Sequence, residues 1–361
     1  MSFLSSTGLS AAGLPCSRGT GTRTVAFSRV RNPDLYHGTG KKSPFFEGWY
    51  FKLVDAAERH SYAVIPGVFI GSDADPSHAF IQTLDGMTGR STYHRYPLEA
   101  FSADAGAMDI RVGPNRFTRD HMSLELTSPE RSMSGVVRFR NLSPWPVTLA
   151  SPGIMGWYAY VPFMECYHGV VSLDHAIEGA LTVDGEQLEF TGGRGYIEKD
   201  WGQGFPDAWV WMQANHFEQP GTSITASVAT IPWLGGSFLG FIAGFWHERR
   251  LHRFATYTGA KLGLLDASED AVRIHLVARP DRRADRPGLR LELTAARAGG
   301  GMLRSPERIA MLQRVEESLT ASVHARLVAL EQGRERTLFD GTGRNAGLEV
   351  VGDLVSSSGR A

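Results

Sequence analysis

Short runs of β-branched and aromatic residues, separated by turn residues, follow one another along the chain from Gly48 onward. Several runs place apolar side chains at every second position, which is typical of strands that bury one face. Between two of the runs stands Asp184-Gly185, a strong signal for a two-residue hairpin turn. The pattern predicts strands at 48–54, 61–70, 79–84, 122–127, 136–139, 176–183, 187–191, 208–217, 223–231, 237–246, 251–257, 272–278 and 289–294.

One stretch, 305–319, has helical rather than strand spacing. Ser305 is placed to cap a helix, Pro306 fits its first turn, and Ile309 and Leu312 follow at helical spacing. Many short strands with few helices favour a sandwich or a barrel. We therefore predict an all-β protein with one short helix near the C-terminus.

Proline and glycine concentrate at 142–167, which indicates a boundary between two modules. Residues 1–33 contain no acidic residue but four arginines, which is typical of a flexible tail or an organellar presequence. We predict a flexible N-terminal tail or presequence at 1–33, an N-terminal β-module at 34–150, and a C-terminal β-module at 151–355.

The composition excludes several classes of protein. With 42% hydrophobic residues the chain of 361 residues can bury a sizeable core, and a net charge of −1 offers no basic field for nucleic acid. Two cysteines, Cys16 and Cys166, make a disulfide framework improbable and favour a reducing compartment. We expect a cytoplasmic protein, with attachment to a membrane surface as an open option and a plastid location as the alternative if 1–33 is a transit peptide.

Aromatic and ionisable residues interleave in the middle of the chain. Six of the eight tryptophans lie between Trp145 and Trp233, so this part should contain buried rings. Ionisable groups are rarely buried there without a partner or a purpose, and pairing with Arg194 or Lys199 is the structural alternative. The interleaved ionisable residues are Glu165, His168, Asp174, His175, Glu198 and Asp200. Their spacing matches no recognised metal site, so we expect no metal.

Three segments resemble the tocopherol cyclase family. The segment 45–52 (Phe-Phe-Glu-Gly-Trp-Tyr-Phe-Lys) resembles its N-terminal motif, and the segments 152–175 and 192–213 resemble its central region. The resemblance extends over roughly 32–355 and implies two lipocalin-like antiparallel β-barrels packed together. It also implies an isomerase of vitamin E biosynthesis that closes a chromanol ring from a prenylated benzoquinol, without a cofactor.

Such a reaction needs an acid that protonates the side-chain alkene, a shelter for the resulting cation, and a base for the phenol proton. A carboxylic acid in a dry pocket stays protonated near neutral pH, and aromatic faces stabilise cations. The resemblance therefore implies acid candidates, with Asp200 first, then Glu198 and Glu165, and finally Asp207 and Glu47. His168 and His175 are candidates for a base or relay. The implied substrate-binding walls are Trp49, Tyr50, Trp157, Tyr158, Tyr167, Trp201, Trp209 and Trp211.

Two other functions stay open at this point. The second is a non-catalytic lipocalin-like carrier of a quinone or isoprenoid, and the third is a hydratase that adds water to an isoprenoid alkene. Buried carboxyls favour an enzyme over a carrier, because a carrier has little use for them. The apolar stretch 145–163 fits either core packing or contact with a membrane surface.

Overall fold

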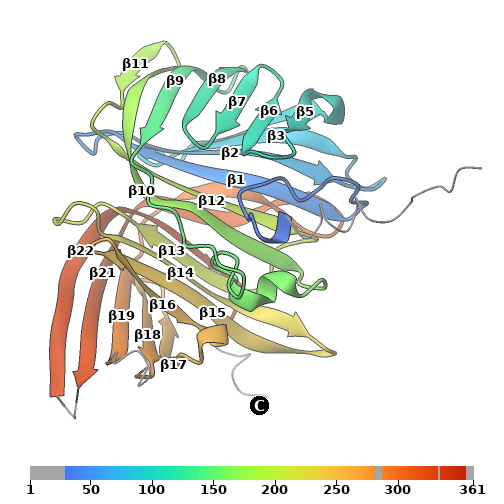
Figure 1. The fold of residues 1–361 in the computed structure, drawn as a ribbon. Helices are drawn as coiled ribbons and strands as arrows, with labels where there is room; N and C mark the ends of the chain where they lie inside the picture. Colours follow the sequence, from blue (N-terminus) through green and yellow to red (C-terminus); the bar gives the residue numbers. More distant parts are fainter. Residues whose placement is uncertain (1–28, 281–286, 332–333, 355–361) are drawn as a thin grey trace, which may run out of the picture.

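The computed structural model describes residues 29–280, 287–331 and 334–354, which form two stacked antiparallel sheets (Figure 1). The first sheet has twelve described strands: β1 (Phe45–Val54), β2 (Ser61–Ile70), β3 (His78–Asp85), β4 (Ser91–Pro97), β5 (Phe101–Ala103), β6 (Asp109–Val112), β7 (Asn115–Thr118), β8 (His121–Thr127), β9 (Ser132–Arg140), β10 (Cys166–Val183), β11 (Glu186–Glu189) and β12 (Arg194–Gly202). The second has ten within the same residues: β13 (Trp209–Ala214), β14 (Ser223–Trp233), β15 (Gly236–His247), β16 (Arg250–Ala255), β17 (Lys261–Ala267), β18 (Ala271–Ala278), β19 (Gly288–Ala296), β20 (Gly301–Pro306), β21 (Met311–Glu331) and β22 (Arg334–Val351).

The all-β prediction is confirmed. Every predicted strand overlaps an observed one, and 61–70 coincides with β2. The predicted hairpin at Asp184-Gly185 joins β10 to β11, and both turn residues have positive φ, as a two-residue turn of this kind requires. The named helical segments are three short 3-10 turns, η1 (Leu98–Ala100), η2 (Gly156–Tyr160) and η3 (Thr256–Thr258). Among the described residues, no helix has the length and apolar character needed to cross a bilayer.

The helix predicted at 305–319 is wrong. The segment forms the end of β20, a turn, and the start of β21. Ile309 and Leu312, which suggested a helical face, are 62% and 46% exposed, whereas Val315 and Leu319 are buried at even spacing. Burial with a period of two continues along β21, so pairing with the neighbouring strands outweighs the local helical spacing.

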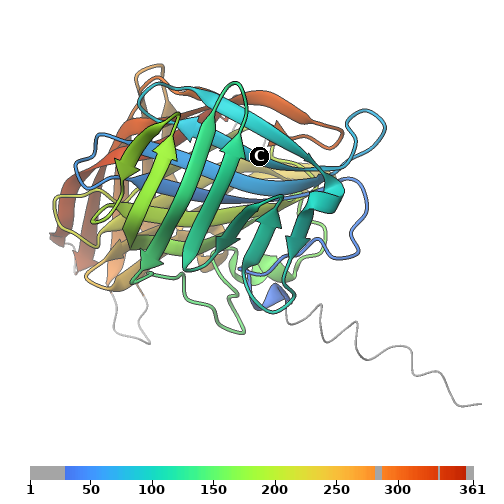
Figure 2. The ribbon, with the colours of Figure 1, turned by 90° about the horizontal axis from the view of Figure 1, so that it is seen from above.

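Both sheets are twisted and curved (Figure 2). The hydrogen-bonded order of the first sheet ends at β4 and β5, and that of the second ends at β16 and β17. Two packed antiparallel sheets are thus established, whereas closure into lipocalin-like barrels stays a prediction.

The first sheet extends across the predicted module boundary at 150/151, and the chain enters the second sheet between Gly202 and Trp209. Membership of a sheet does not by itself define a module, so the division into 34–150 and 151–355 stays a prediction. Most of the predicted tail at 1–33, including Cys16, lies outside the described residues.

Apolar side chains are buried in a core within each sheet and in a further cluster between the sheets. On β1, Trp49 and Phe51 belong to the core of the first sheet, whereas Tyr50 belongs to the cluster between the sheets. Because successive side chains of a strand point to opposite faces, every second residue of β1 and β12 is directed toward the second sheet. This alternation places the polar side chains described next.

Candidate active site

A cavity of about 200 Å³ lies between the two sheets. Strands β1, β10 and β12 of the first sheet line one side, and β13, β21 and β22 of the second sheet line the other. Most of the lining is apolar and aromatic, and the few polar groups come from both sheets. The ionisable residues of the lining whose contacts are described below are His168, Glu198, Asp200, Glu317 and Glu349.

Glu198 is the buried carboxyl of the first sheet. Its side chain accepts hydrogen bonds from the Tyr196 hydroxyl at 2.5 Å and the Trp211 indole N–H at 3.3 Å. Burial raises the pKa of Glu198 to about 7. The positive charge of His168 lowers this pKa in part, and the negative charge of Asp200 raises it further. A large fraction of Glu198 is therefore protonated at neutral pH.

His168 lies between two carboxyl groups. It stands directly opposite Asp200 on the paired strands β10 and β12. Its Nδ1 is 2.8 Å from Asp200 Oδ1, and its Nε2 is 3.4 Å from Glu198 Oε2. Burial disfavours the charged ring, but Asp200 and Glu198 together outweigh it and raise the pKa of His168 to about 9. His168 is therefore protonated at neutral pH, and its imidazolium lies beside Glu198.

The second sheet contributes a pair of carboxyls that the sequence did not suggest. Glu317 on β21 and Glu349 on β22 are directly opposite each other. The Tyr50 hydroxyl donates to Glu317 at 2.5 Å, and the Trp209 indole N–H donates to Glu349 at 2.6 Å.

Glu317 is 1% exposed, and Glu349 is half-buried. Burial raises the pKa of Glu317 well above its usual value, with Glu349 adding to the rise, and burial also raises the pKa of Glu349 to about 7. Two close carboxyls cannot both ionise readily, so this pair retains a proton.

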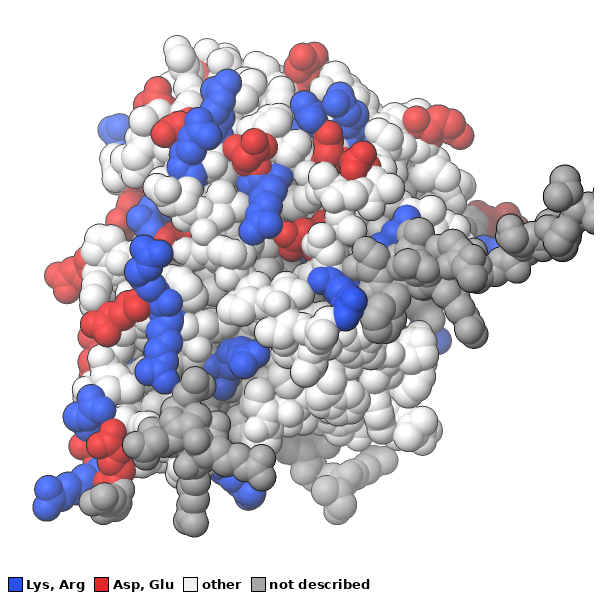
Figure 3. Space-filling view, viewed as in Figure 1, with Lys and Arg blue, Asp and Glu red and all other residues white. Residues whose placement is uncertain are grey.

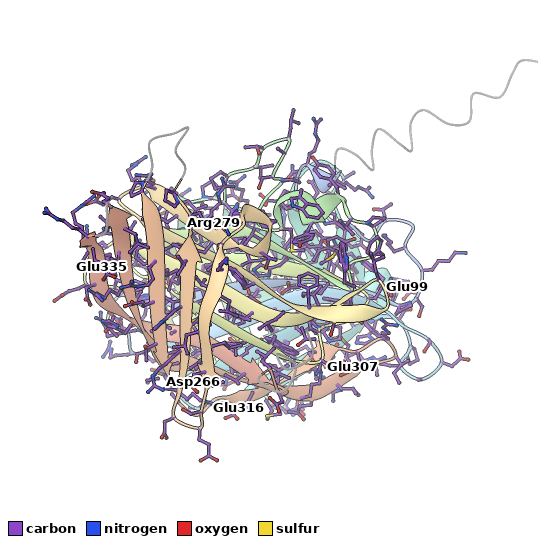
Figure 4. The ribbon with its side chains drawn as sticks, turned by 90° about the horizontal axis from the view of Figure 1, so that it is seen from below. Glu99, Asp266, Arg279, Glu307, Glu316 and Glu335 are labelled. Atoms are coloured by element: carbon purple, nitrogen blue, oxygen red, sulfur yellow. The ribbon has the colours of Figure 1, made fainter. Side chains whose placement is uncertain are left out.

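The sequence held one usable signal for Glu317, namely the alternation of Val315, Glu317 and Leu319 as buried positions of a strand. The helix predicted at 305–319 hid that signal. In Figure 4 the neighbouring Glu316 lies at the outer edge of the molecule, whereas Glu317 is buried. No comparable signal marks Glu349, because it reaches the cavity only through the pairing of β22 with β13 and β21.

The predicted aromatic walls divide into two groups. Five of the rings line the cavity, and they are Tyr50, Tyr158, Tyr167, Trp209 and Trp211.

The other three predicted wall residues lie elsewhere. Trp201 stands behind the wall, stacked on Tyr167 with 5.5 Å between ring centroids. Trp49 is packed in the core of the first sheet, and Trp157 is 46% exposed.

Three of the predicted acids do not line the cavity. Glu47 is on the opposite face of β1 from Tyr50, where it forms a fully buried ion pair with Lys199. Glu165 pairs with Arg308 at 2.9 Å, and Asp207 is exposed. None of these three carboxyls lies where a substrate in the cavity could reach it, so these positions do not suit a proton donor.

His175 is also outside the cavity. It packs against Phe139 with ring centroids 4.8 Å apart, and burial lowers its pKa to about 3. It is therefore a neutral core residue and does not suit a relay to the cavity.

His168, Glu198 and Asp200 each offer a ligand atom within 4.8 Å of the others, so these residues have the donor types and spacing to hold a metal ion. The two ring nitrogens of His168 face different carboxylates, however. Nδ1 is hydrogen-bonded to Asp200, whereas Nε2 lies 3.4 Å from Glu198 and has no hydrogen-bond partner. The expectation of no metal stays a prediction.

Comparison with known proteins identifies the family. The Tocopherol cyclase-like family model matches residues 137–352, which is more than half of the chain. A probable chloroplastic tocopherol cyclase of Oryza sativa subsp. japonica is 24% identical over 62% of this chain and 58% of its own length. A chloroplastic tocopherol cyclase of Zea mays is 24% identical over 66% of this chain and 61% of its own length. The chain thus matches about three fifths of the length of these relatives.

A solved structure shares the fold. The crystal structure of CghA aligns with a TM-score of 0.51 at 10% identity, covering 86% of this chain and 89% of that one. At this identity the likeness concerns the fold alone. The family match extends from β9 to β22, and so includes His168, Glu198, Asp200, Glu317 and Glu349. The chain belongs to the tocopherol cyclase-like family.

Proposed function

We propose that this protein is a tocopherol cyclase-like enzyme that closes a chromanol ring from a prenylated benzoquinol. One observation carries the proposal, namely that Glu198 is buried in an aromatic cavity with a pKa raised to about 7. Membership of the family supports it. A neutral carboxyl beside apolar surface is what protonation of an alkene requires.

Glu198 gives its proton to the alkene carbon nearer the ring, which leaves a tertiary cation. The rings of Trp209, Trp211 and Tyr167 line the same cavity and present electron-rich surface to this cation, worth about 2 kcal/mol or more when desolvated. The His168 imidazolium next to Glu198 favours the carboxylate that remains, so it makes Glu198 a stronger acid. Asp200 holds the ring in place.

The phenol oxygen then bonds to the cationic carbon and loses its proton. We assign the acceptor to the pair Glu317 and Glu349, which lines the cavity from the second sheet. Tyr50 stands directly opposite Glu198 on the neighbouring strand and donates to Glu317. The pair takes up one proton for each proton that Glu198 gives, and exchange with solvent restores both groups, so the reaction needs no net proton and no cofactor.

Hydration is the second candidate, because the carboxyls of the two sheets form a polar niche that suits a water molecule. The same acid would act, and water instead of the phenol would attack the cation. A non-catalytic carrier is less well supported, since Glu198, Glu317 and Glu349 have no lysine or arginine salt-bridge partner among the described residues, and burying such groups is costly.

Product analysis tests the proposal. Purified protein incubated with phytyl- or geranylgeranyl-benzoquinol should form a chromanol of unchanged mass without added cofactor. A product heavier by one water would identify a hydratase instead. Quinol that is bound and recovered unchanged would count against catalysis.

A further inference from the structure

Large apolar side chains are exposed together beside one end of the cavity. We call them the rim patch: Leu149, Trp157, Tyr160, Phe163 and Leu234, which are 66%, 46%, 37%, 53% and 81% exposed. The first four come from the segment between β9 and β10 that contains η2, and Leu234 is the tip of the β14–β15 hairpin. Figure 3 shows a broad uncharged surface over η2 and the adjacent β15.

The rim patch is continuous with the cavity lining. Trp157 packs on Tyr158 with ring centroids 4.2 Å apart, and Tyr158 lines the cavity. Phe163 contacts Trp233 at 5.3 Å, and Trp233 in turn contacts Tyr158 at 6.0 Å. Contacts between aromatic rings therefore connect the patch to the cavity lining without a break.

Leucine is disfavoured at position 234 by the backbone conformation of the turn. Leu234 and Gly235 form the two-residue tip of the hairpin, and both have positive φ, at 44° and 87°. Such a turn favours asparagine, aspartate or glycine, and a branched apolar residue there carries strain. A strained leucine that is 81% exposed contributes nothing to the hairpin, which points to a role outside it.

The size of the cavity gives a further reason. At about 200 Å³ it is smaller than the roughly 300–1,000 Å³ of sites that enclose a drug-sized ligand. A quinol ring fits, but a long isoprenoid chain would extend past Tyr158 onto the rim patch. This step rests on the proposed function, whereas the exposed patch and the strained turn do not.

We propose that the rim patch docks on the surface of a lipid bilayer, so that the cavity exchanges its ligand directly with the lipid. Tryptophan, tyrosine, phenylalanine and leucine are the residues that bind at the boundary of head groups and acyl chains. The net charge of −1 gives the protein no overall attraction to anionic lipid. Docking thus depends on apolar insertion and occurs on neutral phosphatidylcholine, with little dependence on salt.

Vesicle binding of the full chain tests this proposal. Sedimentation with phosphatidylcholine vesicles should capture the native protein equally at low and high salt. Leu234→Asn and Phe163→Ser should each lower the partition coefficient of the protein between vesicles and water. The double variant should lower it about tenfold or more. Leu234→Asn should also leave the melting temperature unchanged or raise it, because asparagine suits the turn. The control is Met87→Asn, at a residue 54% exposed in the β3–β4 turn, which should bind as the native protein does.

The outcomes separate the two proposals. Absence of binding to neutral vesicles, or binding that high salt abolishes, overturns docking by this patch. A concentration-dependent dimer that Leu234→Asn disrupts also overturns it, because the patch would then face a second copy. Vesicle binding that depends on Leu234, in a protein that forms no chromanol, supports docking while the proposed function fails.

Discussion

The two faces of β1 and β12 bury ionisable groups in opposite ways. On the face toward the core of the first sheet, Glu47 pairs with Lys199, whose ammonium also lies 4.8 Å from the ring centroids of Trp49 and of Trp201. On the face toward the second sheet, Glu198 has hydroxyl, indole and imidazole neighbours.

The carboxylate of Glu47 is neutralised by the ammonium of Lys199, which lowers the pKa of Glu47 despite complete burial. Glu198 keeps a raised pKa and borders a cavity. Burial alone therefore does not mark a catalytic carboxyl. A cationic partner keeps a buried carboxyl ionised in a structural ion pair, whereas neutral partners leave it able to hold a proton.

The largest expected effect is on catalysis by the cavity face. Glu198→Gln keeps the shape of the side chain but removes the acid, so we expect turnover of the quinol to fall by about 10³-fold or more. Chromanol formation by the purified variant measures this. Glu165→Gln is the matched control, because Glu165 pairs with Arg308 at the surface, and it should retain turnover. Normal turnover by Glu198→Gln would remove this residue from the role of acid.

On the face of β1 and β12 toward the core of the first sheet, we expect a substitution to lower stability and to leave catalysis unchanged. Glu47→Gln leaves the Lys199 ammonium buried without its carboxylate, which should cost about 3–5 kcal/mol in the free energy of unfolding. Denaturant unfolding of the variant and the native protein gives the difference. Turnover per folded molecule should stay near the native value. A variant of native stability that has lost turnover would reverse our reading of the two faces.

A smaller effect is expected from the carboxyl pair of the second sheet. Glu317→Gln removes one acceptor but leaves Glu349 in place, so we expect turnover to fall by roughly 10–100-fold. Tyr50→Phe should give a decrease of similar size, since it breaks the link to Glu317 without removing the ring. Steady-state rates of both variants, with Glu316→Gln as the neighbouring exposed control, test the assignment. Native rates in both variants would leave the pair without a role in the reaction.

The smallest effect is a dependence of stability on pH. Burial raises the pKa of Glu349 from 4.5 to about 7 in the folded state. Between these pH values the unfolded chain releases a proton that the folded chain retains, so this group's contribution to stability falls as pH rises. Glu349→Gln cannot ionise, and we expect its stability relative to the native protein to rise across this window. Unfolding free energies of the variant and the native protein, measured from acid to neutral pH, show the trend.

Local pattern predicted thirteen of the twenty-two described strands and part of the site. The density of aromatic residues marked the region of Glu198 and Asp200, but no strand was predicted over β12, so the alternation that separates these two residues from Lys199 was not seen. Local pattern failed where the information is not local. Glu317 and Glu349 meet only through the pairing of β21 with β22. Glu47 could be excluded as a cavity acid only once the position of the second sheet showed which face of β1 lines the cavity.

Cyclisation in D₂O tests most directly whether a cavity carboxyl protonates the alkene. The native protein should convert a prenylated benzoquinol into a chromanol with one deuterium on the ring carbon that was the alkene CH, and Glu198→Gln should form almost none. A chromanol without that deuterium, or equal labelling by the variant, would contradict proton transfer from Glu198.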